Sequence, residues 1–158
     1  MAAMIIGLLV AGFVMVDVPK TEPMHHTLYS LHKSIGITII MLALLRLGSW
    51  LRFGAPLLPD AIPAPHRRFA HVGHWAFYGF MVLMPVSGYV MSISNGQPVK
   101  WFGSALPRLL SEDKTRGAMA GDIHAYAAYI LIGMLVLHAG AVIWHYFFER
   151  VNLLRRMM

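Results

Sequence analysis

The sequence predicts an all-α integral membrane protein, a four-helix bundle that forms a single domain over residues 1–158. Two observations support this prediction. Of the residues, 58% are apolar and only 13% are charged, whereas a soluble domain carries about 25% charged residues. The apolar residues are also gathered into four runs rather than scattered, and most of these runs approach or exceed the roughly 20 residues that a helix needs to cross a bilayer.

Each apolar run defines one predicted span. The spans cover about residues 1–16, 28–51, 69–94 and 123–148. The first run is short for a membrane helix, and no basic segment precedes it, so we interpret it as a shortened first helix and not as a signal peptide. The second run is almost continuously apolar from Ile35 to Leu45, which is typical of a helix surrounded by lipid.

The third and fourth spans are set off by their flanking segments. Four prolines between residues 53 and 65 predict a loop before the third span. Pro85 lies inside the third span and should kink it. The polar segment 95–122 separates the third span from the fourth and contains Trp101 and Phe102, which are residue types typical of a membrane interface.

Basic residues predict the orientation of the bundle. They exceed acidic residues in the loop between the second and third spans and in the C-terminal tail, at Arg52, Arg67, Arg68, Arg150, Arg155 and Arg156. Loops rich in arginine and lysine stay on the cytoplasmic side of a membrane. We therefore expect both termini to be cytoplasmic and the other two loops to face outwards.

Composition also excludes several kinds of protein. The absence of cysteine excludes disulfides, iron–sulfur clusters, covalently attached c-type heme and thiolate zinc sites. The chain has no glycine fingerprint of a nucleotide-binding domain, so it cannot take hydride from a soluble carrier by itself. We interpret the net charge of +6 as a sign of orientation and contact with membrane lipid, not of nucleic-acid binding.

Three histidines inside the spans are the strongest candidates for function, because ionisable side chains in a membrane are costly and usually functional. His32 and His124 each lie a few residues into a helix that starts at the outer face, so they should share one depth. Two neutral imidazoles that face each other at one depth can bind a heme iron from both sides. His138 lies 14 residues after His124, which puts it on the same helix face about 21 Å further along.

A second set of polar residues is expected at the inner end. Arg46 follows His32 by the same interval of 14 residues, so it should lie near the depth of His138 and could bind heme propionates. Candidate residues for a quinone site at this end are His71, His74 and His145.

Simpler interpretations remain open for each group. A single membrane histidine is often only a polar contact between helices. Arg46 could extend towards the inner surface without binding a ligand, and packing at the interface explains His71, His74 and His145 as well as function does. The shared depth and face of His32, His124 and His138 favour ligands for these three.

Three segments resemble the bacterial diheme cytochrome b561 family. Ser30–Arg46 reads SLHKSIGITIIMLALLR and is similar to the second helix of that family. Ala70–Met91 reads AHVGHWAFYGFMVLMPVSGYVM and is similar to the third helix. Ile123–Phe148, which contains two of the candidate histidines, resembles the fourth helix. The resemblance covers nearly the whole chain.

The resemblance implies a four-helix bundle of the bacterial inner membrane with two b hemes. It implies that His32 and His124 bind the outer heme and that His138 binds the inner heme. In the family the partner of His138 is a histidine near the start of the first helix, and Met1 falls just after that position. Two readings stay open: the chain start is misplaced, or the inner heme lacks this ligand.

One type of family member oxidises superoxide at the outer face and reduces ubiquinone near the inner face. The leading hypothesis is therefore a superoxide:ubiquinone oxidoreductase that passes single electrons through heme from superoxide or another small donor. The alternative is a non-enzymatic, heme-bearing membrane anchor that relays electrons for a dehydrogenase or hydrogenase. A third hypothesis is a helical membrane protein without a cofactor.

Overall fold

The computed structural model describes residues 1–54 and 64–148, with the backbone alone for 64–67. The predicted proline-rich loop and the C-terminal tail lie largely or wholly outside the described residues. Four helices make up most of the described chain, α1 (Ala2–Asp17), α2 (Pro23–Phe53), α3 (Ala64–Ser94) and α4 (Lys114–Phe147). Two short strands, β1 (Lys100–Trp101) and β2 (Ser104–Ala105), form a hairpin between α3 and α4.

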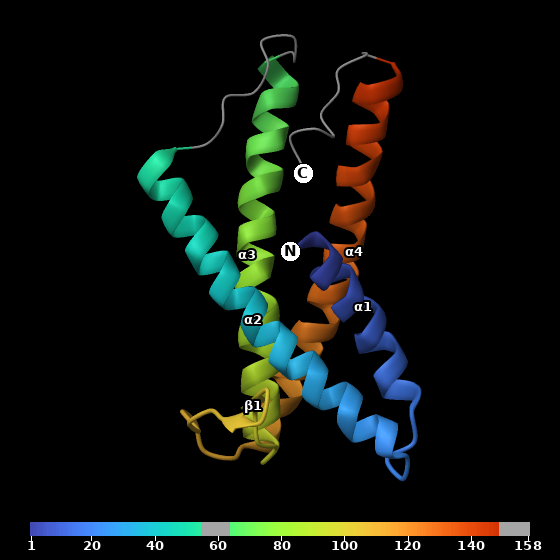
Figure 1. Cartoon of the computed structure of the whole chain (residues 1–158), viewed down its shortest axis with the longest axis vertical. Helices are drawn as coiled ribbons and strands as arrows, with labels where there is room; N and C mark the ends of the chain where they lie inside the picture. The colour runs from blue at the N-terminus through green and yellow to red at the C-terminus, as the bar shows by residue number, and fades with distance from the viewer. Residues whose placement is uncertain (55–63, 149–158) are drawn as a thin grey trace.

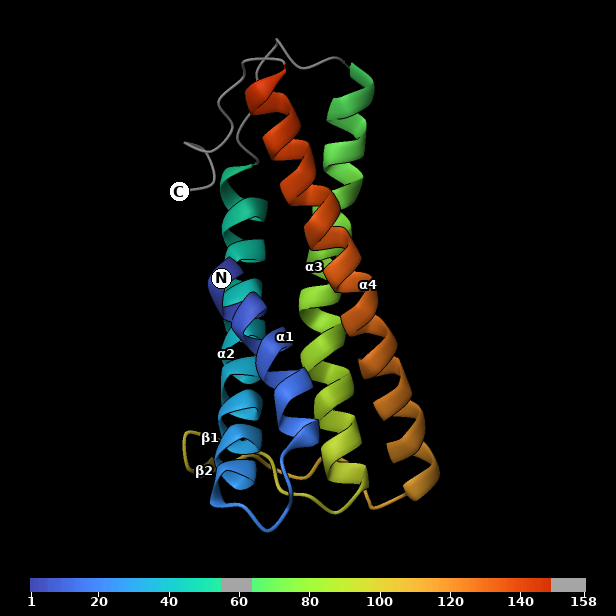
Figure 2. The same cartoon turned by 90° about the vertical axis from the view of Figure 1, so that its right-hand side faces the viewer.

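The helices form an elongated bundle (Figure 1). Figure 2 shows α1 and α2 together on one side and α3 and α4 on the other. The most extensive packing joins α3 to α4, and α2 packs on both α3 and α1. The predicted four-helix membrane bundle is thus confirmed.

Most large apolar side chains in this bundle face outwards. In each of α2, α3 and α4, only 17% of the most apolar stretch is buried inside the protein. The buried positions are mostly small or medium-sized, for example Ala43, Ala120, Ala127 and Ile93. An outer surface of this kind is stable in lipid and would aggregate in water. The three long helices are long and apolar enough to span a membrane, whereas α1 is a shorter apolar helix.

Three of the helices begin earlier than the predicted spans. Helix α4 starts at Lys114 and not near residue 123, because the side chain of Asp113 caps it by accepting a hydrogen bond from the Arg116 backbone N–H at 3.0 Å. Helix α2 starts at Pro23, since proline suits the first turn of a helix, where its missing N–H costs nothing. Helix α3 likewise begins at Ala64.

The hairpin was not predicted from the sequence, which assigned its residues to an irregular polar connection. Trp101 pairs with Ser104, so Phe102 and Gly103 form a two-residue turn in which both have positive φ, 45° and 96°. Such a turn matches the twist of the flanking strands and favours glycine at its second position. The hairpin lies at the same end of the bundle as the α1–α2 connection (Figures 1 and 2).

Side chains of α2 hold this hairpin in place. Ser34 is buried, and its Oγ accepts the Phe102 backbone N–H at 3.0 Å while lying 3.2 Å from the Lys100 carbonyl oxygen. The Trp101 indole N–H donates to Thr38 Oγ1 at 3.1 Å. The outer connection is therefore an ordered cap on the helix that carries His32.

Candidate heme centre

The His32 ring on α2 and the His124 ring on α4 lie close together in an edge-on contact. Their ring centres lie 6.2 Å apart, with the ring planes inclined at 70°. Two imidazoles that would hold one iron between them, each with a nitrogen about 2.0 Å from the metal, would need their ring centres roughly 6 Å apart. The separation of His32 and His124 is compatible with one iron between them, and it also lies within the roughly 4.5–7 Å of ordinary ring contacts.

Helix α3 orients the His124 ring. Its Nδ1 lies 2.9 Å from the Met84 carbonyl oxygen and 3.1 Å from Ser87 Oγ. A carbonyl can only accept, so Nδ1 carries the proton and donates to Met84. The other nitrogen, Nε2, then has a free lone pair, which is the tautomer that binds a metal. Met84 and Ser87 flank Pro85, which lies inside α3.

Two glycines leave space for the two rings. A Cβ atom at Gly88 on α3 would lie 3.1 Å from His124 Cε1 and 3.3 Å from its Nδ1. A Cβ atom at Gly12 on α1 would lie 3.4 Å from His32 Cε1. All four helices thus contribute to the surroundings of this pair, and the missing side chain at Gly88 allows His124 to approach the α3 backbone.

The Nδ1 atom of His32 is a buried polar atom without a hydrogen-bond partner in the described residues. Proteins rarely leave such an atom unsatisfied, so its burial marks a place where another group belongs. The ring separation and the oriented His124 tautomer fit a b heme that His32 and His124 would hold between them, and the orphaned His32 Nδ1 adds a buried polar atom that no described residue satisfies. Because the chain has no cysteine, the heme would be held without a covalent thioether bond.

A second pair of histidines lies towards the other end of the bundle. The His138 ring on α4 lies 6.2 Å from the His74 ring on α3, with the planes inclined at 59°. The edge of His138 also contacts Phe77 at 5.3 Å. The sequence predicted His74 as a quinone-site candidate, and its contact with His138 was not expected. Spacing along α3 could not have predicted this contact, because it depends on how α3 packs against α4.

Ring distance alone does not make the His74–His138 pair a metal site, because ordinary ring contacts also fall between 4.5 and 7 Å. For the outer pair, an oriented tautomer and an orphaned nitrogen add to the distance. For His74 and His138 the structure gives neither, since no hydrogen bond fixes either ring within the described residues. We therefore keep His138 as a ligand candidate and His74 as its neighbour.

Arg46 lies beside this inner pair, as its spacing predicted. Its guanidinium Nε–H donates to the Tyr78 hydroxyl oxygen on α3 at 3.1 Å, and its charge acts on the His74 ring. Tyr78 was not identified from the sequence as a site residue. His71 is exposed one turn before His74, while His145 is half-buried two turns beyond His138 on α4.

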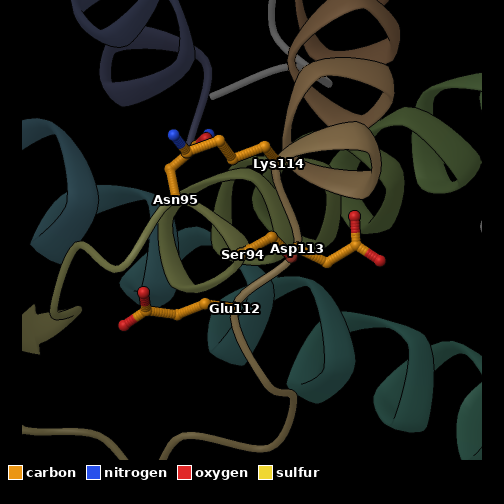
Figure 3. Close-up of a pocket in the computed structure, with 5 residues that line it drawn as sticks. All are labelled: Ser94, Asn95, Glu112, Asp113 and Lys114. Carbon is orange, nitrogen blue, oxygen red and sulfur yellow. The ribbon is translucent and has the colours of Figure 1, made fainter.

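The surface at the hairpin end of the bundle carries mixed charge. Arg108 pairs with Glu112 at 3.1 Å, and Arg116 lies 3.9 Å from Asp113. A cavity of about 300 Å³ at this end is lined by Ser94, Asn95, Glu112, Asp113 and Lys114 (Figure 3). Arg108 and Arg116 are therefore paired with acids, which reduces the attraction of this surface for an anion.

A membrane bundle whose facing imidazoles fit a heme iron, in a chain without cysteine, defines a class of protein, the membrane cytochromes of b type. Comparison with known proteins gives the family. The family model described as prokaryotic cytochrome b561 matches residues 1–158, and the chain belongs to this family. The protein is therefore an inner-membrane, heme-binding electron-transfer protein, as the sequence resemblance implied.

Named relatives agree with this family. The chain is 29% identical to cytochrome b561 homolog 2 of Escherichia coli strain K12, over 99% of this chain and 84% of the relative. It is 30% identical to the probable superoxide oxidase CybB of Yersinia pestis, over 81% of this chain and 73% of the relative. Cytochrome b561 homolog 1 of E. coli is 24% identical over 89% of this chain and 80% of the relative.

Proposed function

We propose that this protein transfers single electrons from a small donor at its outer face, with superoxide as the donor, to ubiquinone near its inner face. The facing pair of His32 and His124 is the single observation that carries this proposal. It supports a one-electron centre close to the outer surface. The relative from Yersinia pestis, named as a probable superoxide oxidase, supports the choice of donor.

His32 and His124 are the proposed axial ligands of the outer heme, and His138 is a proposed ligand at the inner level. A bound b heme supplies reversible uptake and release of one electron. The Met84 carbonyl orients the His124 ring, and apolar helices surround both rings. His138 lies about 21 Å from His124 along the same helix. The two histidines would therefore belong to the inner and the outer heme, respectively.

Electron and proton balance assigns different tasks to the two faces. Each superoxide loses one electron and leaves as dioxygen, so the outer face needs no proton donor. One ubiquinone takes up two electrons and two protons to form ubiquinol, so the inner face needs polar groups that hydrogen-bond the quinone and connect it to water. His71, His74 and His145 are the proposed residues for this task, and Arg46 is the proposed partner of heme propionates.

Stopped-flow absorbance on purified protein tests the proposal. A superoxide source should reduce the heme faster than superoxide dismutates, and added ubiquinone should oxidise the heme again. The His124→Ala variant should lose the first reaction. Absence of heme reduction by superoxide in the wild-type protein would exclude superoxide as the donor. A larger enzyme that co-purifies and reduces the heme would then support the relay alternative.

A variant of His74 tests the proposed quinone site in the same experiment. The His74→Ala variant should keep its heme content and its reduction by superoxide but should be reoxidised by ubiquinone about tenfold more slowly or worse, an effect typical of lost acid–base groups. The exposed His26, at the opposite end of the bundle, supplies the control variant His26→Ala. Loss of one heme in His74→Ala would instead make His74 an iron ligand and overturn its quinone role.

A further inference from the structure

Arg46 and Tyr78 form the only side-chain hydrogen bond between α2 and α3 in the described residues. The Arg46 Nε–H donates to the Tyr78 hydroxyl at 3.1 Å. Within the same residues no partner is found for the two terminal nitrogens of the guanidinium. Arginine presents its N–H groups as a planar fork, so a bond at Nε fixes the plane and leaves the terminal pair to bind another group.

The position of this pair is as informative as its hydrogen bond. Tyr78 lies one helical turn after His74 on α3, and its ring is 6.3 Å from that of Trp75. Trp75 in turn contacts Trp50 of α2 edge-on at 5.0 Å. These aromatic contacts hold Tyr78 between two helices, and the charge of Arg46 acts on His74, which itself lies against His138.

We propose that Tyr78 is a positioning residue that turns the Arg46 guanidinium so that its two terminal nitrogens bind the carboxylates of the heme at the inner level. This inference rests on the proposed function, which assigns His138 and Arg46 to that heme. Two parallel N–H groups match the geometry of a carboxylate, and a fixed guanidinium loses less side-chain entropy when it binds. Tyr78 itself touches neither the iron nor the substrate.

A hydrogen bond at Nε also argues against a purely snorkelling Arg46. A snorkelling arginine extends its head along the helix towards water and needs no partner inside the bundle. Arg46 instead reaches across to a tyrosine on the neighbouring helix. The side chain is exposed, so the terminal nitrogens remain accessible to a ligand.

A fixed positive charge beside a heme favours the reduced state, because reduction adds a negative charge. The midpoint potential of the inner heme therefore reports the position of the guanidinium. Arg46→Gln should lower the reduction equilibrium constant of that heme by about tenfold, as expected for a partly screened charge at close range. Tyr78→Phe, which removes only the hydroxyl, should lower it by roughly threefold, because Arg46 stays present but less ordered.

Spectroscopic redox titration of the membrane-embedded protein tests this inference without measuring turnover. The double variant Tyr78→Phe/Arg46→Gln should match Arg46→Gln alone, since Tyr78 acts through Arg46. The outer heme should not shift in any variant. The control is Tyr126→Phe, at an exposed tyrosine on the outer half of α4, which should change neither heme.

Three outcomes would overturn the inference. An unchanged inner potential in Tyr78→Phe would show that the hydroxyl does not position the charge. Additive shifts in the double variant would show that Tyr78 acts independently of Arg46. A wild-type protein that titrates as a single heme would overturn the assignment of the inner heme and this inference with it, whereas two titrating hemes with no response to Tyr78→Phe would overturn this inference alone.

Discussion

At the scale of single residues, the surroundings of His124 explain why its ring suits iron. The Met84 carbonyl fixes the protonated nitrogen, and Gly88 leaves room for the ring against α3. The sequence predicted which histidines are ligand candidates, because depth and helical face follow from spacing. It did not predict the roles of Met84, Gly88 or Tyr78, since the contact of a residue with another helix depends on how the helices pack, and spacing along one helix does not contain that information.

A methyl group at Gly88 tests the fit around His124. A Cβ atom there would lie 3.1 Å from the His124 ring, so Gly88→Ala should displace the ring and reduce the bound heme, measured by pyridine hemochrome assay, at least severalfold. Gly79→Ala on the same helix is the matched control, because nothing lies within 4 Å of its added Cβ, and it should retain full heme content. Equal heme content in both variants would contradict a close approach of His124 to α3.

At the scale of elements, an interval of 14 residues recurs on three helices. It separates His32 from Arg46 on α2, His74 from Gly88 on α3, and His124 from His138 on α4. Because 14 residues are close to four helical turns, the two residues of each interval lie on the same face of their helix. One lies at the level of the His32–His124 pair and the other at the level of the His74–His138 pair. The sequence predicted this regularity for α2 and α4. The hairpin escaped prediction because two-residue strands are too short to show an alternating pattern.

Removal of the Ser34 hydroxyl tests how α2 holds the hairpin. Ser34→Ala would leave the Phe102 N–H without its acceptor, and an unsatisfied group of this kind costs about 1–3 kcal/mol. Hydrogen exchange at the Phe102 amide should therefore accelerate by about fivefold or more. Ser49→Ala is the control, because the Ser49 hydroxyl bonds only to Leu45 of its own helix. Unchanged exchange at Phe102 would mean that other contacts hold the hairpin.

At the scale of the whole molecule, the outward-facing apolar side chains make lipid the natural surroundings of the bundle. The figures place the hairpin and the α1–α2 connection at one end, away from the C-terminal ends of α2 and α4. Composition and run length were sufficient to predict the membrane bundle and its four helices. The orientation of the bundle in the membrane follows only from the distribution of basic residues and stays a prediction.

The absence of cysteine allows a clean test of orientation. Single cysteines introduced by Lys100→Cys in the hairpin and Phe53→Cys at the end of α2 fall at exposed positions at opposite ends. In intact spheroplasts, a membrane-impermeant maleimide should label only the Lys100→Cys variant. It should label Phe53→Cys after the membrane is permeabilised. Labelling of Phe53→Cys alone in intact spheroplasts would reverse the predicted orientation.

The most direct test of the account is the heme content of the ligand variants, because the proposed function depends on His32 and His124 sharing one iron. Purified wild-type protein should show a b-type reduced-minus-oxidised spectrum. His32→Ala and His124→Ala should each lose the same heme, and the double variant should lose no more than either single variant. Full heme content and an unchanged spectrum in both single variants would contradict the claim that this pair holds the heme.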